Sequence, residues 1–403
     1  MKIDTAKKGI IKNTLYTIGG ALVLNAVLQL FIYPRLTSEM GAKEIGNVIY
    51  IMGLINIIGP SVGQALNTSR LVLRRDHELK NGDYNVILII LSVIGAGVCA
   101  AMSTDAMGGV LGGILLVICS VLTTLRFYGD VEYRISLDYK RYFIYYLSAS
   151  VGYILGYLIY KISNVWYPVF IAGELCAIIY VSVKGKIFRN FFERSSFAGT
   201  AAFKGMTLVG SYLLTNITLN VDKIALKHLI GSEAVTQYYV ASLIGKTLVL
   251  LIAPINTIII SYLTKGKERI GYGKFLKFTG AGFLVSFVFF LACQVANPIF
   301  IRLFYGDILS EVKDILTVVN ISQILSLLSA YLFIVVLTFT EEKWQLILQG
   351  AHMVILVILI LAMTGKGGIA GFSEAVLIAN AVRIAAVLIL GMMRAGRRKA
   401  VEV

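Results

Sequence analysis

Long apolar runs recur along the whole chain and restrict it to one kind of fold. A helix that spans a bilayer needs about 20 mostly apolar residues, and twelve stretches of the 403-residue sequence meet this requirement. Hydrophobic residues make up 58% of the chain and charged residues only 15%, whereas soluble proteins carry about 25% charged residues. The sequence therefore predicts an all-α polytopic membrane protein with about 12 transmembrane helices, because a helix satisfies its own backbone hydrogen bonds in lipid. The predicted spans lie at about residues 14–34, 45–66, 85–101, 109–127, 142–160, 164–183, 205–221, 238–263, 275–295, 315–340, 345–364 and 374–393.

Basic residues are distributed unevenly between the segments that join these spans. If the N-terminus is cytoplasmic, 27 of the 37 Lys and Arg residues fall in cytoplasmic segments and 8 in outer segments. The remaining two, Lys246 and Arg383, lie inside predicted spans. This bias follows the positive-inside rule, so we expect both termini in the cytoplasm. The net charge of +15 suits an anionic membrane surface, and we expect no nucleic-acid partner.

The most basic loop, residues 184–204, divides the predicted spans into six and six. We therefore expect an N-terminal six-helix lobe over residues 1–190 and a C-terminal lobe over 191–403, joined by a basic cytoplasmic linker. The mixture of Phe with Lys and Arg in this linker predicts a helix that lies at the membrane interface. The segments 40–54 and 230–245 share a Gly, a short polar step and the start of a long span. This similarity favours two lobes related by a parallel repeat.

Motifs for enzymatic chemistry are incomplete in this chain. The tripeptide Gly245-Lys246-Thr247 resembles the end of a phosphate-binding loop, but Val240 occupies the position where that loop needs Gly. The three histidines and four cysteines show no metal-ligand spacing. We therefore expect neither an enzyme nor a metal or other cofactor.

Three charged residues lie deep inside predicted spans: Glu174, Lys246 and Arg383. At 1.5 Å per residue, each is about 12–15 Å from the outer end of its span. A charge at the bilayer centre costs at least about 2.5–3.5 kcal/mol, so each residue is a candidate functional group. Two interpretations remain open, since these side chains either pair to hold helices together or bind an ion or ligand. Five tyrosines near the third cytoplasmic segment predict an interfacial aromatic belt: Tyr133, Tyr139, Tyr142, Tyr145 and Tyr146.

A polar stripe runs along the seventh predicted span. Asn216, Asn220 and Lys223 are spaced i, i+4, i+7 and share one helix face, with Asp222 beside it. A polar face on a membrane helix turns toward protein or water instead of lipid. We therefore expect this helix to line a cavity.

The run Asn220…Asp222…Leu226…Gly231…Val235…Tyr238…Ala241 resembles a repeat-initiating signature of polysaccharide flippases. These proteins belong to the multidrug/oligosaccharidyl-lipid/polysaccharide exporter superfamily, whose twelve-span layout is also similar to this chain along its whole length. The resemblance implies two lobes that form a V around a cationic cavity. It also implies outward movement of a lipid-diphosphate-linked oligosaccharide by alternating access. The chain departs from the family by its short length and its few deep arginines.

The resemblance assigns roles to the charged residues. A diphosphate needs a substitute for its hydration, which Arg supplies by bidentate contact and Lys as a point charge. The predicted substrate-binding cations are Lys246 and Arg383 at mid-depth, Arg126 and Arg134 near the cytoplasmic entrance, and Arg35 near the exit. Glu174 is the candidate coupling carboxylate for H+ or Na+, and the membrane potential is a further candidate driving force.

The expected function is a flippase for an undecaprenyl-diphosphate-linked oligosaccharide in the plasma (inner) membrane of a bacterium. Its expected partners are that substrate, membrane lipids, a polysaccharide polymerase and glycosyltransferases. Three alternatives remain: a cation-coupled exporter of small amphipathic molecules on the same fold, a peptidoglycan-precursor flippase, and a membrane scaffold that transports nothing. The exporter is expected to carry a cluster of acidic residues inside its spans, of which only Glu174 is evident.

Overall fold

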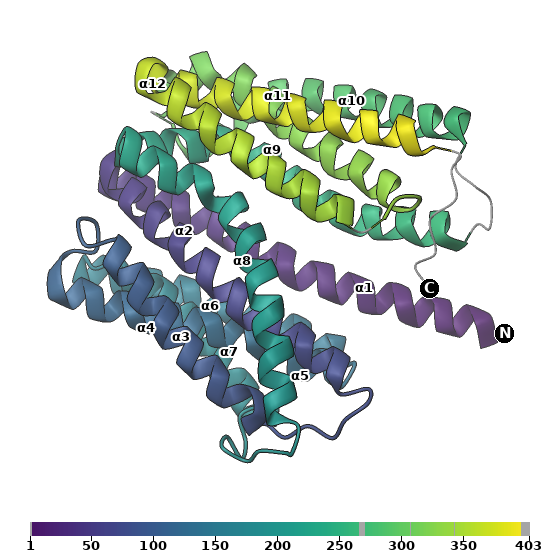
Figure 1. The fold of residues 1–403 in the computed structure, drawn as a ribbon. Helices are drawn as coiled ribbons and strands as arrows, with labels where there is room; N and C mark the ends of the chain where they lie inside the picture. The colour runs from purple at the N-terminus through teal and green to yellow at the C-terminus, as the bar shows by residue number, and fades with distance from the viewer. Residues whose placement is uncertain (1, 266–270, 307, 342, 396–403) are drawn as a thin grey trace. The chain divides into compact units, whose positions relative to one another are not determined.

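The computed structural model describes residues 2–265, 271–306, 308–341 and 343–395, and all their side chains except those of residues 2–12, 249–265, 345 and 346. Within these ranges the chain is helical, without β-strands (Figure 1). The elements are α1 (Lys2–Ala26), the π-helical turn η1 (Val27–Ile32), α2 (Tyr33–Leu73), α3 (Gly82–Met102), α4 (Gly109–Gly129), α5 (Val131–Ile135), α6 (Tyr139–Ser163), α7 (Tyr167–Lys184), α8 (Ala198–Leu229), α9 (Ser232–Lys265), α10 (Tyr272–Phe304), α11 (Ile308–Leu337) and α12 (Lys343–Arg394).

Two long helices contain a sharp break at a glycine. Gly41 in α2 and Gly368 in α12 have φ values of 79° and 55°, which glycine adopts at little cost because it has no Cβ. Each break separates two of the predicted spans, so all twelve predicted spans lie on helical segments. By length and composition, eight helical stretches of the described residues are able to cross a membrane, and two of these contain the breaks. The protein is therefore a multi-pass, all-α membrane protein, as predicted.

The contacts between helices divide the chain into two compact units, Met1–Ile224 and Ala225–Val403. In unit 1, α6 packs along α7 and α1, and α4 contacts α2, α3 and α7 (Figure 1). In unit 2, α11 packs against α9, α10 and α12. The predicted lobe boundary at residues 190 and 191 stays a prediction, and the division between the compact units falls inside α8.

Glycines bring α6 and α7 into close contact in unit 1. Gly152 and Gly156 form a Gly-x-x-x-Gly motif, which allows the backbones of membrane helices to approach closely. A Cβ atom at Gly152 would lie 2.5 Å from the carbonyl oxygen of Ala172, and one at Gly156 would collide with the Pro168 carbonyl of α7. The α6–α7 pair therefore depends on these two glycines.

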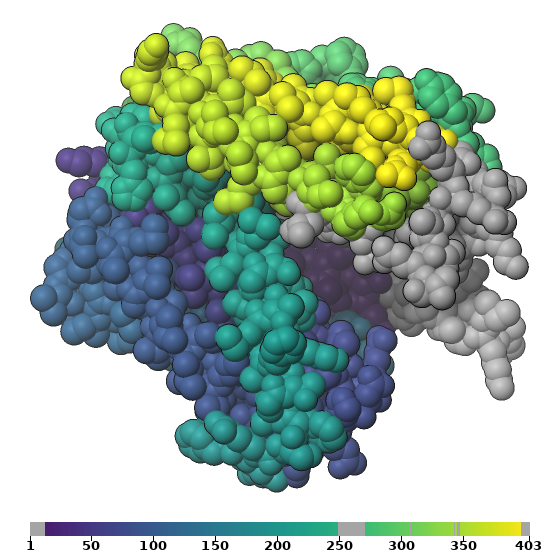
Figure 2. Space-filling view, viewed as in Figure 1, coloured from purple at the N-terminus to yellow at the C-terminus, as the bar shows by residue number. Residues whose placement is uncertain are grey.

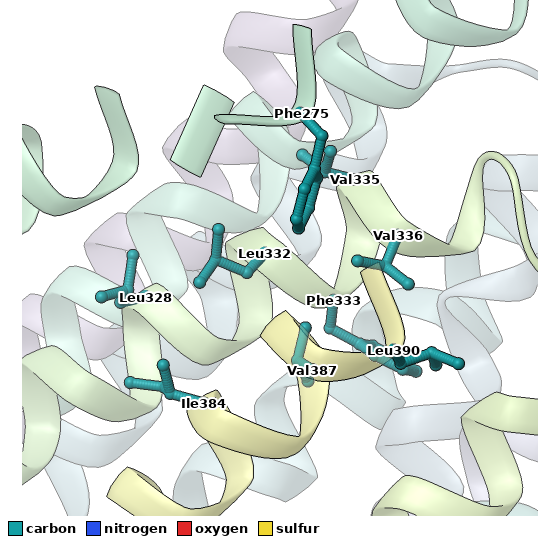
Figure 3. Packing of buried hydrophobic residues seen from close by; sticks show 9 residues of the cluster. All are labelled: Phe275, Leu328, Leu332, Phe333, Val335, Val336, Ile384, Val387 and Leu390. Carbon is teal, nitrogen blue, oxygen red and sulfur yellow. The ribbon is translucent and has the colours of Figure 1, made fainter. Parts of the chain in front are cut away.

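The core of unit 2 joins α10, α11 and α12 (Figure 3). Phe275 of α10 belongs to one cluster with Leu332 and Val335 of α11 and with Val387 and Leu390 of α12, among its nine buried residues. The break at Gly368 divides α12 into two arms. The second arm, coloured yellow, lies on the surface of this unit (Figure 2). Its outward face carries exposed apolar side chains such as those of Val382, Ile389 and Met393, as a lipid-facing helix requires.

The basic linker does not form the predicted interfacial helix. Its residues 185–197 are turns and irregular backbone, and α8 begins at Ala198. The start of α3 holds this segment in place: the Asn81 side-chain amide donates to the carbonyls of Lys186 and Arg189 at 2.9 and 2.7 Å. The Asp83 carboxylate accepts hydrogen bonds of 2.7 Å from both the backbone N–H and the hydroxyl of Ser195. These long-range bonds satisfy polar groups that a helix would have satisfied locally, which is why the prediction was wrong.

Candidate functional site

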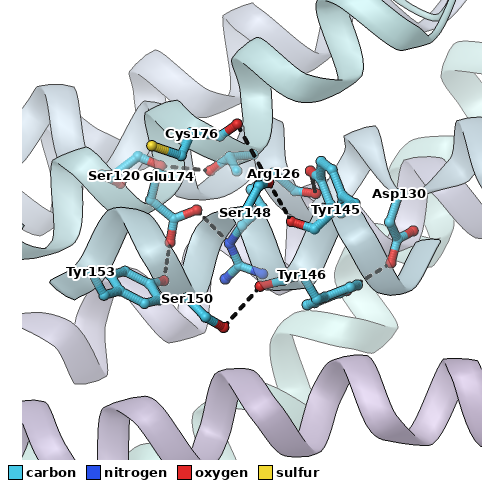
Figure 4. Close-up of polar contacts among 11 residues, drawn as sticks. Ser120, Arg126, Asp130, Tyr145, Tyr146, Ser148, Ser150, Tyr153, Glu174 and Cys176 are labelled. Carbon is cyan, nitrogen blue, oxygen red and sulfur yellow. Dashed lines mark hydrogen bonds and ion pairs between the residues drawn. The ribbon is translucent and has the colours of Figure 1, made fainter. Parts of the chain in front are cut away.

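A buried ion pair joins α4 and α7 in unit 1 (Figure 4). The Arg126 Nε donates to one carboxylate oxygen of Glu174, and the Tyr153 hydroxyl donates to the other at 2.9 Å. Arg126 is 5% exposed and Glu174 is 1% exposed. Arg126 lies in the last turn of α4, and its side chain reaches back along the helix because Cβ atoms tilt toward the N-terminus. The predicted coupling carboxylate thus has a cationic partner in the structure.

A second buried carboxylate, Asp130, lies one helical turn beyond Arg126. It accepts hydrogen bonds from the Tyr146 hydroxyl at 2.9 Å and from the Arg134 guanidinium at 3.0 Å. The Asn67 side-chain amide of α2 also donates to it. Asp130 is only 1% exposed, so these three donors replace its water shell. Both arginines predicted for the cytoplasmic entrance, Arg126 and Arg134, are therefore ion-paired within unit 1.

The tyrosines predicted to form an interfacial belt belong mostly to this network. Tyr133, Tyr142, Tyr145 and Tyr146 are buried, and only Tyr139 is partly exposed. The Tyr145 hydroxyl donates to the Arg126 carbonyl at 2.8 Å. The belt prediction was wrong for the four buried tyrosines. Composition alone does not separate an interfacial tyrosine from one whose hydroxyl bonds to a buried charged residue.

Sequence reasoning missed Asp130 and Tyr153 as members of the network. Two local signals were present. Asp130 precedes Arg134 by four residues, the spacing of a helical ion pair. Tyr142, Tyr146 and Tyr153 are spaced i, i+4, i+11 and so share one face of α6. Either pattern would have indicated a polar face directed into protein.

The polar stripe of α8 faces α2. The Asn216 side-chain amide donates to the Ser61 hydroxyl at 3.0 Å, and the Lys223 stem packs against Gly53, both on α2. Asn220 accepts a 2.6 Å hydrogen bond from the Lys223 ammonium, and Asp222 beside them is buried. The prediction that this face turns away from lipid is confirmed. Its role in lining a cavity stays a prediction.

The Arg383 side chain, on the second arm of α12, contacts the first arm. Its Nη2 donates to the Gln349 side-chain oxygen at 3.1 Å, and its buried Nε has no hydrogen-bond partner among the described residues. His352, one turn beyond Gln349, is close enough to interact electrostatically with Arg383. No described carboxylate forms an ion pair with Arg383. Its formal charge is therefore compensated by neutral dipoles alone within the described part of unit 2.

The remaining predicted cations occupy different surroundings. Lys246 is half-buried in α9, and its ammonium lies 5.7 Å from the centre of the Tyr238 ring. Tyr238 in turn packs edge-on against Phe372 of α12. Arg35 is exposed at the start of α2, with its guanidinium 6.0 Å from the Phe31 ring centre. The assignment of these side chains to substrate binding stays a prediction.

Comparison with known proteins gives a fold but no sequence relative. Neither a protein-family model nor a curated protein sequence matches the chain. Among solved structures, the lipid II flippase MurJ in an inward closed conformation aligns with a TM-score of 0.71 at 14% identity, covering 93% of this chain and 87% of that protein. The chain has the fold of MOP-superfamily transporters. An inward-facing multidrug resistance MATE family transporter of that superfamily aligns with a TM-score of 0.62 at 14% identity over 95% of this chain and 94% of its own.

A third structure is similar along nearly the whole chain as well. This MOP-superfamily transporter from Pyrococcus furiosus, described as having a binding pocket of reversed polarity, aligns with a TM-score of 0.60 at 15% identity. The alignment covers 96% of this chain and 95% of that protein. MOP is the superfamily that the run from Asn220 to Ala241 resembles. The predicted fold class and the resemblance in fold are therefore confirmed.

Proposed function

We propose that this protein is a flippase that moves an undecaprenyl-diphosphate-linked oligosaccharide from the cytoplasmic to the outer leaflet by alternating access. The observation that carries the proposal is Arg383, a largely enclosed cation that only neutral groups contact among the described residues. An enclosed charge without a counter-ion is costly, so the arrangement favours an anionic substrate. The fold shared with MurJ, described as a lipid II flippase, supports a lipid-linked substrate.

The chemistry of the two cations in unit 2 fits a diphosphate. The planar Arg383 guanidinium forms its one hydrogen bond among the described residues with Gln349, and guanidinium N–H groups match phosphate oxygens in fork-like contacts. Lys246 acts as a movable point charge, and the Tyr238 ring stabilises it while it is partly dehydrated. Arg126 and Arg134 already neutralise Glu174 and Asp130. The proposal therefore rests on Arg383 and Lys246, with Arg35 as an exposed cation in unit 1.

The proposed cellular setting follows from this substrate. The protein would lie in the plasma membrane of a bacterium with both termini in the cytoplasm. Glycosyltransferases would build the substrate on its cytoplasmic side, and a polysaccharide polymerase would use the translocated product. H+, Na+ or the membrane potential would drive the cycle.

Complementation in the native host tests this function. A strain deleted for the gene receives wild type, Arg383→Gln, Lys246→Gln or Lys366→Gln, and the amount of each variant in the membrane is measured. Lys366 is an exposed cation of the same helix as Arg383 and serves as the matched control. We expect the deletion and the Arg383→Gln strain to accumulate lipid-linked oligosaccharide on the cytoplasmic side and lose surface glycan. Normal surface glycan in the deletion strain would exclude the proposed flippase.

The same strains distinguish the peptidoglycan-precursor alternative. Accumulation of lipid II in place of a lipid-linked oligosaccharide would assign that substrate, as the similarity to MurJ allows.

A cation-coupled exporter is the second candidate, because unit 1 encloses two carboxylates, Glu174 and Asp130. Solved transporters of the multidrug MATE family share this fold. The exporter predicts that deletion changes sensitivity to small cationic drugs and leaves surface glycan intact. It also predicts that Asp130→Asn removes ion-driven drug efflux from proteoliposomes.

A further inference from the structure

A groove lies between the end of α10 and the start of α11, away from the residues assigned above. Its volume is about 740 Å³, and both walls come from unit 2. Arg302 of α10 and Lys313 of α11 line it, so two cations face one space. The Lys and Arg distribution predicts that this end of the helices is the outer one. Only eight Lys and Arg residues fall in the predicted outer segments, where cations are generally few. Two of these eight line one groove, which indicates a site for an anion.

Hydrogen-bonding groups line the groove beside the two cations. The Gln294 side-chain amide donates to the Thr317 hydroxyl at 3.2 Å, which ties α10 to α11 inside the groove. Pro298, one turn further along α10, has no N–H. The backbone carbonyl of Gln294 therefore lacks its usual helical donor, the N–H four residues later, and is an acceptor for hydroxyl groups.

The described carboxylates near the groove, Glu311 and Asp314, do not line it. Glu311 accepts a 3.0 Å hydrogen bond from Gln237 of α9 and does not line the groove. Asp314 is about 100° from Lys313 around α11, since a helix has 3.6 residues per turn, and does not line it either. Among the described lining residues, the only formal charges are positive.

An apolar stripe runs along α10 directly beside the groove. Leu291, Val295, Ile299 and Leu303 are 50–74% exposed and share one face of the helix. Val295, Ile299 and Leu303 each follow a residue that lines the groove, namely Gln294, Pro298 and Arg302. In a membrane-spanning helix such an exposed face contacts acyl chains. The cationic groove thus lies at the end of a lipid-facing surface.

We propose that this groove binds the phosphate of an anionic membrane lipid in the outer leaflet, with the acyl chains along the α10 apolar stripe. Arg302 and Lys313 contact the phosphate, while the Gln294 carbonyl and the Ser310 and Thr317 hydroxyls are placed for headgroup hydroxyls. The site is separate from the proposed substrate cations and does not depend on the flippase assignment. The same phosphate chemistry would also accept free phosphate, which the apolar stripe does not explain.

Lipid titration of the purified full-length protein tests the proposal. Native mass spectrometry measures phosphatidylglycerol binding to wild type, Arg302→Gln, Lys313→Gln and the double variant, with Lys366→Gln as the matched surface control. A Lys or Arg near an anionic membrane contributes about 1 kcal/mol, so each single variant is expected to bind about fivefold more weakly and the double variant about 25-fold. Unchanged affinity in the double variant, or an equal loss in Lys366→Gln, would overturn the site.

Two further measurements separate the sources of phosphate and cover variants that misfold. Ile299→Ser with Leu303→Ser is expected to weaken phosphatidylglycerol binding, and millimolar inorganic phosphate is expected not to displace the lipid. Normal lipid affinity in that variant together with displacement by phosphate would assign free phosphate and reject the lipid. In the wild type, a photoactivatable phosphatidylglycerol is expected to label peptides from residues 294–317. Labelling confined to other peptides would refute the proposal without any variant.

Discussion

Glu174→Gln is the substitution whose effect the structure defines best. It removes the negative charge from a pair in which Arg126 is 5% exposed and Glu174 1% exposed, so solvent screening does not reduce the loss. Removing one partner of such a buried pair costs about 3–5 kcal/mol, because the other charge stays buried without compensation. Tyr153 keeps an acceptor, since the glutamine oxygen takes the place of the carboxylate oxygen that it contacts at 2.9 Å. We expect Arg126→Met to cost a similar amount.

The double variant Arg126→Met/Glu174→Gln isolates the charge pair. It removes both charges of the pair, and its expected cost is about 1–3 kcal/mol for the unsatisfied glutamine N–H groups. A double-mutant cycle is therefore expected to give a coupling energy of at least about 3 kcal/mol. For a unit of this size, 1 kcal/mol corresponds to about 2–4 °C in Tm. Each single variant should then unfold about 6–20 °C below wild type.

Thermal unfolding of the purified protein, in one detergent at one pH, measures this cycle. Glu44→Gln, at an exposed carboxylate of α2, is the control and is expected to change stability by less than about 0.5 kcal/mol. Additive single effects in the double variant would refute the reasoning. Transport by the double variant separates the two roles of Glu174: recovery with recovered stability assigns a structural pair, and loss despite recovered stability assigns a coupling carboxylate.

Three further results are expected. Gly152→Ala should destabilise unit 1 by about 1–3 kcal/mol through overpacking against α7. Gly97→Ala is the control and should not destabilise it, because a Cβ atom at Gly97 would meet no atom within 4 Å. Equal Tm values for both variants would contradict the close α6–α7 contact. The Lys80 ammonium, 2.8 Å away, lowers the pKa of Glu193 below its ordinary 4.5, so this bridge stabilises fully above pH 4.5 and is lost as pH falls through the lowered pKa. A 13C NMR titration of the Glu193 carboxyl should move back toward 4.5 in Lys80→Met, and an unchanged midpoint would rule out the bridge. In reconstituted vesicles Arg383→Gln should slow flipping by roughly 10- to 100-fold, because it removes one charge-assisted contact with the substrate. Arg383→Lys should keep part of the rate. Wild-type rates in both variants would remove Arg383 from the site.

Local features of the sequence predicted the architecture well. Every predicted span lies on a helical segment, because about 20 consecutive apolar residues in a bilayer leave the backbone few alternatives to a helix. The stripe of Asn216, Asn220 and Lys223 was also a local pattern, and it faces protein as predicted. The prediction of an interfacial helix in the basic linker was wrong, because hydrogen bonds with Asn81 and Asp83, about a hundred residues earlier, determine the backbone conformation of the linker.

The partners of the buried charges were decided by the tertiary structure alone. Glu174 and Arg126 are 48 residues apart in the chain, and Asn67 and Asp130 are 63 apart. Hydropathy and charge counts place such residues along a span, yet they do not specify the helix face that another helix will cover. By itself, the sequence determined the class of protein, the spans and the scarcity of deep charges. Packing of the helices determined that Arg126 neutralises Glu174, whereas only neutral groups among the described residues contact Arg383. The physical reason is that the electrostatic energy of a charge in low-dielectric surroundings depends mainly on the groups within a few ångströms of it.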